Sequence, residues 1–116
     1  MRIKKELLKG STSIMILKII SKSDAYGYQI TQELYKSSGE IFKLNEGTLY
    51  PILHAMEKDG FIKSYSKVSE HGRLRKYYSI TQLGKISLAT QIEEWRVFST
   101  AVNEILREGW YVWFVF

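Results

Sequence analysis

The most constraining feature of this sequence is a helical pattern that ends at a glycine and is followed at once by two strand-like runs. Apolar residues at three- and four-residue steps predict a helix over residues 45–59, which Gly60 ends. Phe61–Val68 and Leu74–Ile80 alternate in the manner of strands, and SEHGR between them has the composition of a turn. A helix followed directly by a β-hairpin is therefore expected.

Two further helical segments precede this unit. Apolar spacing predicts a helix over residues 3–22 with a weak point at Gly10, and a second, shorter helix over residues 26–38. Asp24 is the expected N-cap of the second helix, because an aspartate side chain can accept from the free N–H groups of a first turn. Three helices joined by short turns and followed by a hairpin make a winged helix-turn-helix. The predicted fold class is mostly α, with a small β part (α+β).

A long helix is expected after the hairpin, over residues 82–108, with Thr81 as its cap. Its apolar positions alternate four- and three-residue steps, and Ser99 fills the one remaining place. This heptad spacing predicts a dimerisation helix that packs against a second copy of the chain. The residues expected at that contact are Leu88, Ile92, Trp95, Val102 and Leu106. Residues 1–81 would form the winged domain, and residues 82–116 the C-terminal helix with an apolar tail.

The tail, WYVWFVF at residues 110–116, is almost wholly apolar. It is too short to cross a bilayer, which takes about 20 apolar residues. A helix extension that buries Trp110 and Trp113 at a dimer contact is one interpretation, and a β-prone segment or an altered C-terminus are others. The sequence does not decide among them.

Length and charge narrow the class of protein. A chain of 116 residues has the length of one domain, and the absence of cysteine fits the reducing cytoplasm. Because the first ten residues are charged and no apolar run approaches the length of a membrane span, we expect neither a secretory signal nor a membrane segment in this sequence. Residues 1–89 hold 15 Lys and Arg against 8 Asp and Glu, whereas residues 90–116 hold 2 against 4. A basic body with a slightly acidic end favours a cytoplasmic module that binds a polyanion such as DNA.

The helix predicted over residues 45–59 has one face that is almost free of side chains. Its opposite, core face consists of Leu49, Ile52, Leu53 and Met56. Gly47 and Pro51 leave the backbone bare, and Pro51 has no N–H for the carbonyl of Gly47. With Asn45 as N-cap, the free N–H groups and the helix dipole at this end favour phosphate oxygens. The residues expected to contact double-stranded DNA are Asn45, Gly47, Thr48, Tyr50, Pro51 and His54.

The hairpin adds cations to this picture. Arg73, Arg75 and Tyr77 share one face of the second strand, and Lys76 lies on the other. Such a tip suits the minor groove or its flanking phosphates, so these four residues are further candidates for DNA contact. A solvated hairpin, with Gly47 and Pro51 only shaping a kink, is the alternative interpretation. Glu46 is expected to turn inward and to cap or pair, since its charge is unfavourable against phosphate.

Three segments carry a resemblance to a known family. YGYQI (26–30), LNEGTLYPILHAMEKDGFI (44–62) and GRLRKYYSITQLG (72–84) resemble the PadR family of bacterial transcriptional regulators, in order and at the right spacing. The resemblance covers residues from about 10 to about 106. It implies a winged helix-turn-helix that dimerises through its C-terminal helix and usually represses transcription. A dimer of this kind would read a pseudo-palindromic operator. One departure from the family pattern is Leu74, where many members carry a small residue or proline.

The single C-terminal helix is similar to the short subfamily, which includes the multidrug-binding lactococcal regulator. There, a Trp from each subunit sandwiches planar aromatic drugs, and Trp95 matches it by position. The resemblance thus implies an alternative function, that of a sensor for planar aromatic compounds. Two indoles can stack on a flat, often cationic ligand. A Trp in a heptad seam can equally be a packing residue.

Other classes are less well supported. A winged-helix module that binds proteins would not need the cations at the hairpin tip. No Gly-rich phosphate loop follows a strand, and the acidic residues and the two histidines, His54 and His71, lack a metal-ligand spacing. We therefore expect neither an enzyme nor a bound cofactor or metal.

Overall fold

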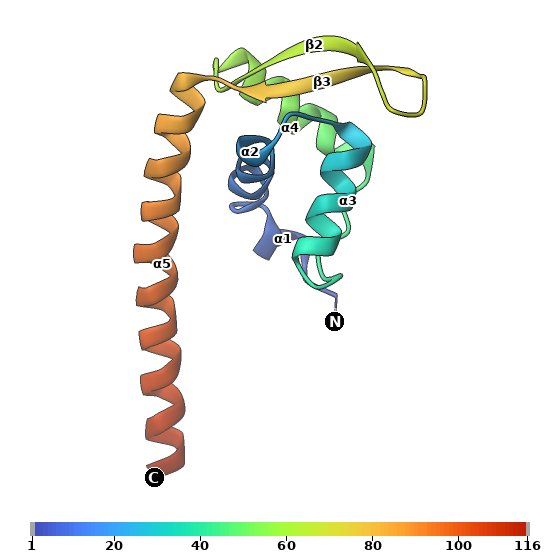
Figure 1. The fold of residues 1–116 in the computed structure, drawn as a ribbon. Coiled ribbons are helices and arrows are strands. Elements are labelled where there is room, and N and C mark those ends of the chain that lie inside the picture. The colour runs from blue at the N-terminus through green and yellow to red at the C-terminus, as the bar shows by residue number, and fades with distance from the viewer. Residues whose placement is uncertain (1, 116) are drawn as a thin grey trace.

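The computed structural model describes the backbone of residues 2–115 and the side chains of residues 2–107. Within residues 2–115, five helices and three strands follow one another (Figure 1). The helices are α1 (Lys5–Leu8), α2 (Thr12–Lys22), α3 (Gly27–Ser37), α4 (Glu46–Lys58) and α5 (Gln82–Val115). The strands are β1 (Ala25–Tyr26), β2 (Ile62–Val68) and β3 (Leu74–Ile80). The chain is therefore mostly helical with one small sheet, as the sequence predicts, and the break between α1 and α2 falls at the expected weak point.

The start of α3 corrects one prediction. The backbone N–H of Tyr26 donates to the Gln29 side chain at 3.2 Å, so Tyr26 and not Asp24 stands at the N-terminus of this helix. Asp24 lies in the extended segment that leads into β1, and its carboxylate accepts a hydrogen bond from the Tyr65 hydroxyl at 2.6 Å. The prediction was wrong because a strand of two residues between α2 and α3 has no pattern that could be recognised.

The sheet is antiparallel with strand order β1-β3-β2. Ile62 pairs with Ile80 at the base of the β2–β3 hairpin, and Val68 pairs with Leu74 next to its turn. On the other side of β3, Ala25 and Tyr26 pair only with Tyr78 and Tyr77. The β2–β3 hairpin is the wing predicted from the sequence, and it extends beyond the helices on one side of the molecule (Figure 1).

The core lies between the sheet and helices α2, α3 and α4. Its buried apolar residues come from every one of these elements and include Ile16, Leu17, Ile20, Ile30, Leu49, Leu53, Met56, Ile62 and Tyr78. Leu88 of α5 belongs to the same cluster and is only 6% exposed. The prediction that Leu88 lies at a dimer contact is therefore wrong, because the first turns of α5 pack against α2 of their own chain.

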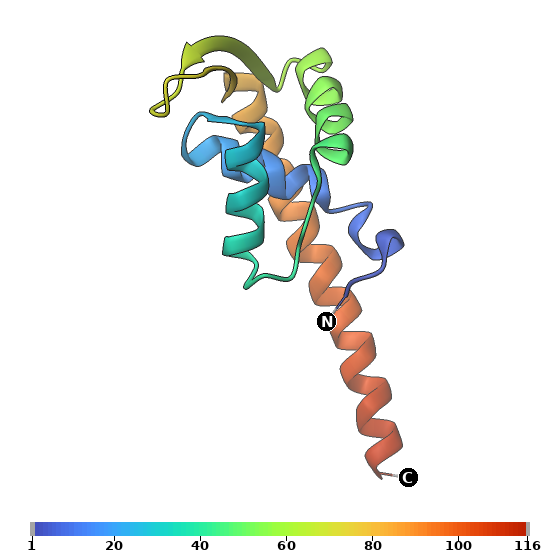
Figure 2. The ribbon, with the colours of Figure 1, turned by 90° about the vertical axis from the view of Figure 1, so that its right-hand side faces the viewer.

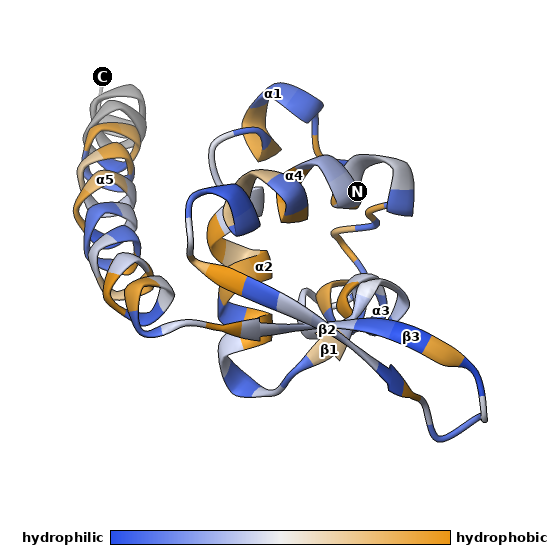
Figure 3. Ribbon diagram, turned by 90° about the horizontal axis from the view of Figure 1, so that it is seen from above, coloured by the Kyte–Doolittle hydropathy of each residue, from blue (hydrophilic) through white to orange (hydrophobic). Residues whose placement is uncertain are grey.

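After its first turns, α5 runs past the N-terminal segment, with which residues 91–98 line a pocket, and then leaves the domain as a long arm (Figures 1 and 2). The molecule measures 63 × 30 × 21 Å along its principal axes, and the arm accounts for the long dimension. Seen from above, apolar residues colour parts of α5 that no other element covers (Figure 3). The helix continues past the predicted end, but the side chains of Trp110 and Trp113 lie outside the described residues. Over the part of the chain that is described, no helix is long and apolar enough to cross a membrane.

Candidate nucleic-acid interface

The N-terminal end of α4 has the geometry expected from the sequence. The Asn45 side chain accepts from the backbone N–H of Thr48 at 2.8 Å, which caps the first turn. Leu49 and Leu53 are fully buried, whereas Gly47 and Pro51 are exposed on the opposite side. The exposed side therefore presents backbone and the positive end of a helix dipole to solvent.

Tyr50 is held in place by a glycine that the sequence analysis did not single out. A Cβ atom placed on Gly27 would lie 2.7 Å from the Tyr50 hydroxyl, so the ring packs closely over the start of α3. Tyr50 is still 38% exposed. The close approach of Gly27 and Tyr50 joins the two helices of the helix-turn-helix beside the bare face of α4.

Glu46 does not behave as expected. Its side chain is exposed, and it forms no ion pair with the side chains of residues 2–107. The expectation of an inward turn was wrong because the first turn of a helix itself stabilises an acid through its free N–H groups. The face that includes Thr48 and His54, both exposed, thus carries one acidic side chain at its edge.

On the wing, Lys76 lies on the side that packs against α4. Its Nζ atom is 4.0 Å from Glu57 of α4, and Ser64 of β2 donates to the same carboxylate at 2.7 Å. The Lys76 side chain remains half exposed. Glu57 thus ties both strands of the wing to α4, a role that spacing within one helix could not reveal.

The other face of the sheet carries a row of three tyrosines, one from each strand. The rings of Tyr26 and Tyr77 meet edge to face with centroids 5.3 Å apart, and Tyr65 stacks on Tyr77 at 5.7 Å. Tyr77 is only 7% exposed in the middle of this row. The prediction that Tyr77 contacts DNA is therefore wrong, because alternation along a strand does not show that neighbouring strands cover a residue on both sides.

Two wing cations lie on this tyrosine row. The Arg75 guanidinium is 5.2 Å from the centroid of the Tyr26 ring, and Lys67 Nζ is 5.2 Å from that of Tyr77. The Nε atom of Arg75 is buried and has no hydrogen-bond partner among the described residues. Cation–π contacts of this kind fix where the charged ends of the two side chains lie.

The tip of the wing is closed by a tight turn. Ser69 donates its N–H to the Arg73 carbonyl at 2.8 Å, and Gly72 adopts a φ of 80°, which glycine tolerates best. Arg73 is exposed. Next to it, Val68 and Leu74 face each other across the strands and are 58% and 70% exposed. The tip therefore combines a cation with an uncovered apolar pair.

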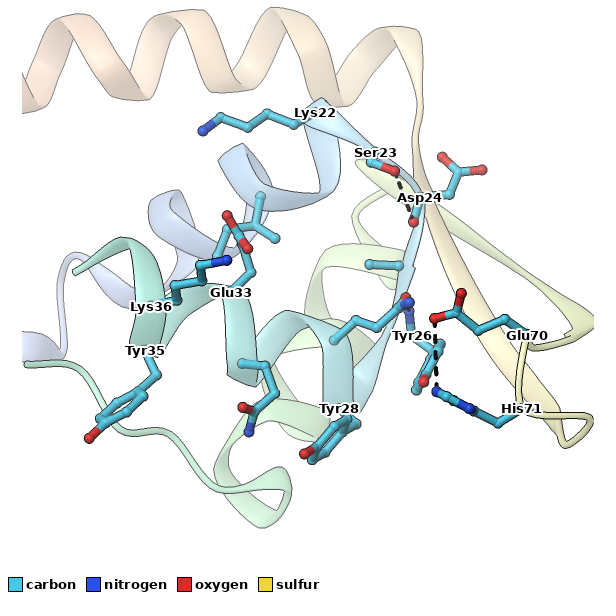
Figure 4. A pocket seen from close by; sticks show the side chains of 14 residues that line it. Lys22, Ser23, Asp24, Tyr26, Tyr28, Glu33, Tyr35, Lys36, Glu70 and His71 are labelled. Carbon is cyan, nitrogen blue, oxygen red and sulfur yellow. Dashed lines mark hydrogen bonds and ion pairs between the residues drawn. The ribbon is translucent and has the colours of Figure 1, made fainter. Parts of the chain in front are cut away.

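A shallow pocket separates this tip from α3. Figure 4 shows Glu70 and His71 of the tip reaching towards Tyr26, with Tyr28 beside them. His71 Nε2 lies 3.9 Å from Glu70 Oε1, and both side chains are well exposed. Among the described residues, no group of three His, Cys, Asp or Glu side chains could hold a metal ion. The pocket has no set of converging groups that would indicate catalysis.

A second surface lies on α5. Four of the five residues predicted at a dimer contact are exposed in this single chain, namely Ile92, Trp95, Val102 and Leu106. Phe98 and Ile105, which the heptad reading missed, are exposed next to them, and the Trp95 and Phe98 rings lie 5.9 Å apart. We call these six residues the α5 face. Exposed apolar side chains that gather on one face of a helix mark a candidate interaction surface.

Comparison with known proteins agrees with this geometry. Residues 16–90 match the transcriptional regulator PadR-like family. The chain is 30% identical over 102 residues to a transcriptional regulator of Mycobacterium tuberculosis, which covers 88% of this chain and 89% of that protein. It is also 36% identical over 93 residues to an uncharacterized protein of Lysinibacillus sphaericus, covering 80% and 85% of the two chains.

Solved structures show the same fold. A transcriptional regulator from Clostridium thermocellum superimposes with a TM-score of 0.79 at 31% identity, over 88% of this chain and 96% of that one. A PadR-like transcriptional regulator from Bacillus cereus gives a TM-score of 0.78 at 37% identity, over 88% and 97%. The winged helix-turn-helix with a long C-terminal helix is thus an arrangement that these regulators share.

Proposed function

The chain belongs to the PadR-like family of DNA-binding transcriptional regulators, and from this membership we propose that it works as a homodimeric repressor. It is a regulator and not an enzyme. In the proposal, residues 1–81 form the DNA-binding part and residues 82–116 the dimerisation part. Two copies of α4, about 34 Å apart, would read the two halves of a pseudo-palindromic operator.

The observation that carries the DNA-binding proposal is the exposed, nearly bare face at the N-terminus of α4. Gly47 and Pro51 allow the backbone to approach a duplex closely, and the helix dipole favours phosphate. The proposed contacts from this helix are Asn45, Gly47, Thr48, Tyr50, Pro51 and His54. Thr48 and Tyr50 would influence sequence preference, because phosphate contacts fix position while side chains at base edges distinguish sequences.

We assign the wing cations to phosphates beside the groove. Arg73 is exposed at the tip, and Arg75 and Lys76 lie on opposite faces of β3. Each lysine or arginine that neutralises a phosphate contributes about one unit to the slope of log affinity against log salt concentration. This dependence makes the assignment measurable residue by residue.

The test uses a duplex that the wild-type protein selects from random oligonucleotides, with binding followed by fluorescence anisotropy from low to high salt. Arg73→Ala should weaken binding and make the salt slope shallower by about one unit. Lys85→Ala removes an equal charge from an exposed position on α5 and should change neither the affinity nor the salt slope. A wild-type protein that binds no duplex even at low salt would refute the function, and an unchanged slope in Arg73→Ala would refute the wing contact.

The dimer proposal rests on the exposed α5 face. A lysine placed in an apolar interface loses its hydration without gaining a partner, which strongly disfavours association. Val102→Lys should therefore shift the protein towards monomer in sedimentation equilibrium. Thr100→Lys is the matched control, because it adds the same charge two residues away on the other side of the helix. Equal effects of the two substitutions would contradict the assignment of this face.

A planar aromatic effector at Trp95 is our second proposal for the same surface. Trp95 is 49% exposed and has Phe98 beside it, with Glu94 as a neighbouring acid, whereas Glu93 is paired with Arg96. Planar aromatic cations should quench tryptophan fluorescence in the wild type and far less in Trp95→Leu. If a broad panel of such cations gave no quenching that depends on Trp95, this residue would be a packing residue only.

A further inference from the structure

We propose that the hydrogen bond between Tyr65 and Asp24 is a clamp that sets the angle between the wing and the helix-turn-helix, and thereby positions Arg75, the proposed phosphate contact that lies on the tyrosine row, on DNA. The inference rests on the proposed function, because it concerns how the wing meets a duplex. Tyr65 and Asp24 are positioning residues in this proposal, and neither is among the residues assigned to DNA contact.

The bond crosses the whole sheet. The Tyr65 hydroxyl donates to Asp24 Oδ2 at 2.6 Å, although the two residues are 41 positions apart. Tyr65 lies in the edge strand β2, and Asp24 immediately precedes the opposite edge strand β1. The Tyr65 ring lies nearly parallel to Tyr77 of the central strand, at an interplanar angle of 17°. Stacking on Tyr77 thus directs the hydroxyl across β3 to the far edge.

The wing needs such a bond because its regular attachment is short. Strand β1 has two residues and pairs only with Tyr77 and Tyr78, so the hairpin from Lys76 outwards has no third strand. An isolated two-stranded hairpin is marginally stable in water at best. The clamp holds one face of the hairpin where it leaves the body, and Glu57 of α4 holds the other face through Lys76 and Ser64, so loss of the clamp would leave the wing attached on one face only.

The clamp also holds Tyr65 at the end of the tyrosine row on which Arg75 and Lys67 lie. Arg75 rests over Tyr26 and Lys67 over Tyr77, each at 5.2 Å. Tyr65 covers the other side of this row through its stack on Tyr77. If the Tyr65 hydroxyl lost its partner, the ring would be free to rotate away, and the support beneath both cations would loosen.

A simpler interpretation treats Asp24 only as an exposed acid whose charge repels phosphate. The two interpretations differ for Tyr65→Phe, which keeps the ring and changes no charge. If Asp24 acts only by its charge, the hydroxyl of Tyr65 is irrelevant to DNA binding. If the clamp exists, its loss should weaken binding, and the loss should depend on the presence of Asp24.

The experiment is a double-mutant cycle with Tyr65→Phe, Asp24→Ala and the combined variant, measured on the full chain with the selected duplex described above. Tyr65→Phe should lower affinity by about two- to tenfold, the usual range for one intramolecular hydrogen bond, and should make the salt slope shallower by about one unit. In the Asp24→Ala background the same substitution should have no further effect. Tyr35→Phe, which removes a hydroxyl from the half-buried Tyr35 of α3, is the control and should bind as the wild type does.

The outcomes separate the clamp from the function. Unchanged affinity and slope in Tyr65→Phe would overturn the clamp, as would an equal loss with and without Asp24. A loss of affinity at constant salt slope would also overturn it, because general loosening of the fold does not remove a particular phosphate contact. A wild-type protein that binds no duplex would instead refute the proposed function itself.

Discussion

Replacement of Gly84 by alanine should detach the first turn of α5 from the base of the wing. A Cβ atom at this position would lie 2.0 Å from the Phe61 carbonyl oxygen, 2.9 Å from its carbon and 2.8 Å from Ile80 Cγ1. The Phe61 atoms belong to the backbone and cannot rotate away. The same carbonyl accepts the Thr81 N–H at 3.0 Å, so a shift that relieves the clash also strains this hydrogen bond.

The magnitude follows from these two effects. Overpacking costs about 1–3 kcal/mol and a strained hydrogen bond about 1 kcal/mol, so we expect the free energy of unfolding to fall by about 2–4 kcal/mol. At about 4 °C per kcal/mol for a domain of this size, the melting temperature should fall by roughly 8–16 °C. This loss is a large fraction of the roughly 5–15 kcal/mol by which a native domain is stable.

The assay is urea denaturation followed by fluorescence, at one protein concentration for all variants because association changes apparent stability. Gly10→Ala is the control, since nothing lies within 4 Å of a Cβ atom there. It should stay within about 1 kcal/mol of the wild type. If Gly84→Ala lost less than 1 kcal/mol, the close packing of α5 on the hairpin base would be refuted.

Three further predictions concern the interface and the core. The new methyl group of Gly27→Ala would meet only the flexible Tyr50 side chain, so the melting temperature should stay within about 5 °C of the wild type. Affinity for DNA should nevertheless fall several-fold, because Tyr50 would be displaced. An unchanged affinity would show that the position of Tyr50 does not matter for DNA binding. Glu46→Gln should raise the affinity for DNA, measured by anisotropy, because it removes an exposed acid beside the proposed phosphate site. It should also lower the free energy of unfolding by about 0.3–1 kcal/mol, because the acid interacts with the helix dipole. A lower affinity for DNA would contradict the placement of this face. The hydroxyl of Tyr78 is buried without a partner among the described residues, and burial raises its pKa, so the folded state binds this proton more tightly than the unfolded chain does. The stability that this proton contributes is complete below about pH 10 and is lost as the pH rises through the raised pKa of the folded state. In thermal melts, Tyr78→Phe should therefore be as stable as the wild type at pH 7 and should lose less stability than the wild type above pH 10. Equal losses of stability above pH 10 would refute this prediction.

Much of the fold could be predicted because its long elements carry strong local signals. Helix α4 begins directly after the predicted cap Asn45 and ends before Gly60. Strand β2 begins one residue later than predicted, and β3 has the predicted bounds. In each case a periodic apolar pattern is bounded by residues that favour a helix end or a turn. The exposure of Gly47 and Pro51 was predicted from the same helical periodicity that placed the core residues on the opposite face.

Two of the errors share one physical cause, which is that a pattern within one element does not show which other elements cover it. Leu88 fits the heptad seam but is buried by α2, and Tyr77 alternates correctly but is covered by strands on both sides. Strand β1 has only two residues and so has no period to detect. Asp24 was expected to cap α3 because this strand was not recognised. Its hydrogen-bond partner, Tyr65, is distant in the sequence and could not be predicted from local pattern.

One consequence follows from the way the wing passes into α5. Only Thr81 separates β3 from α5, and its side chain donates to the Gly60 carbonyl at 2.6 Å while its oxygen accepts the Gly84 N–H at 3.0 Å. Thr81 and the buried Leu88 together hold the first two turns of α5 against the base of the hairpin and against α2. The part of α5 that could tilt therefore begins beyond Leu88. At 1.5 Å per residue, Leu106 lies about 27 Å from Leu88, so a tilt of about 5° there would displace Leu106 by about 2 Å.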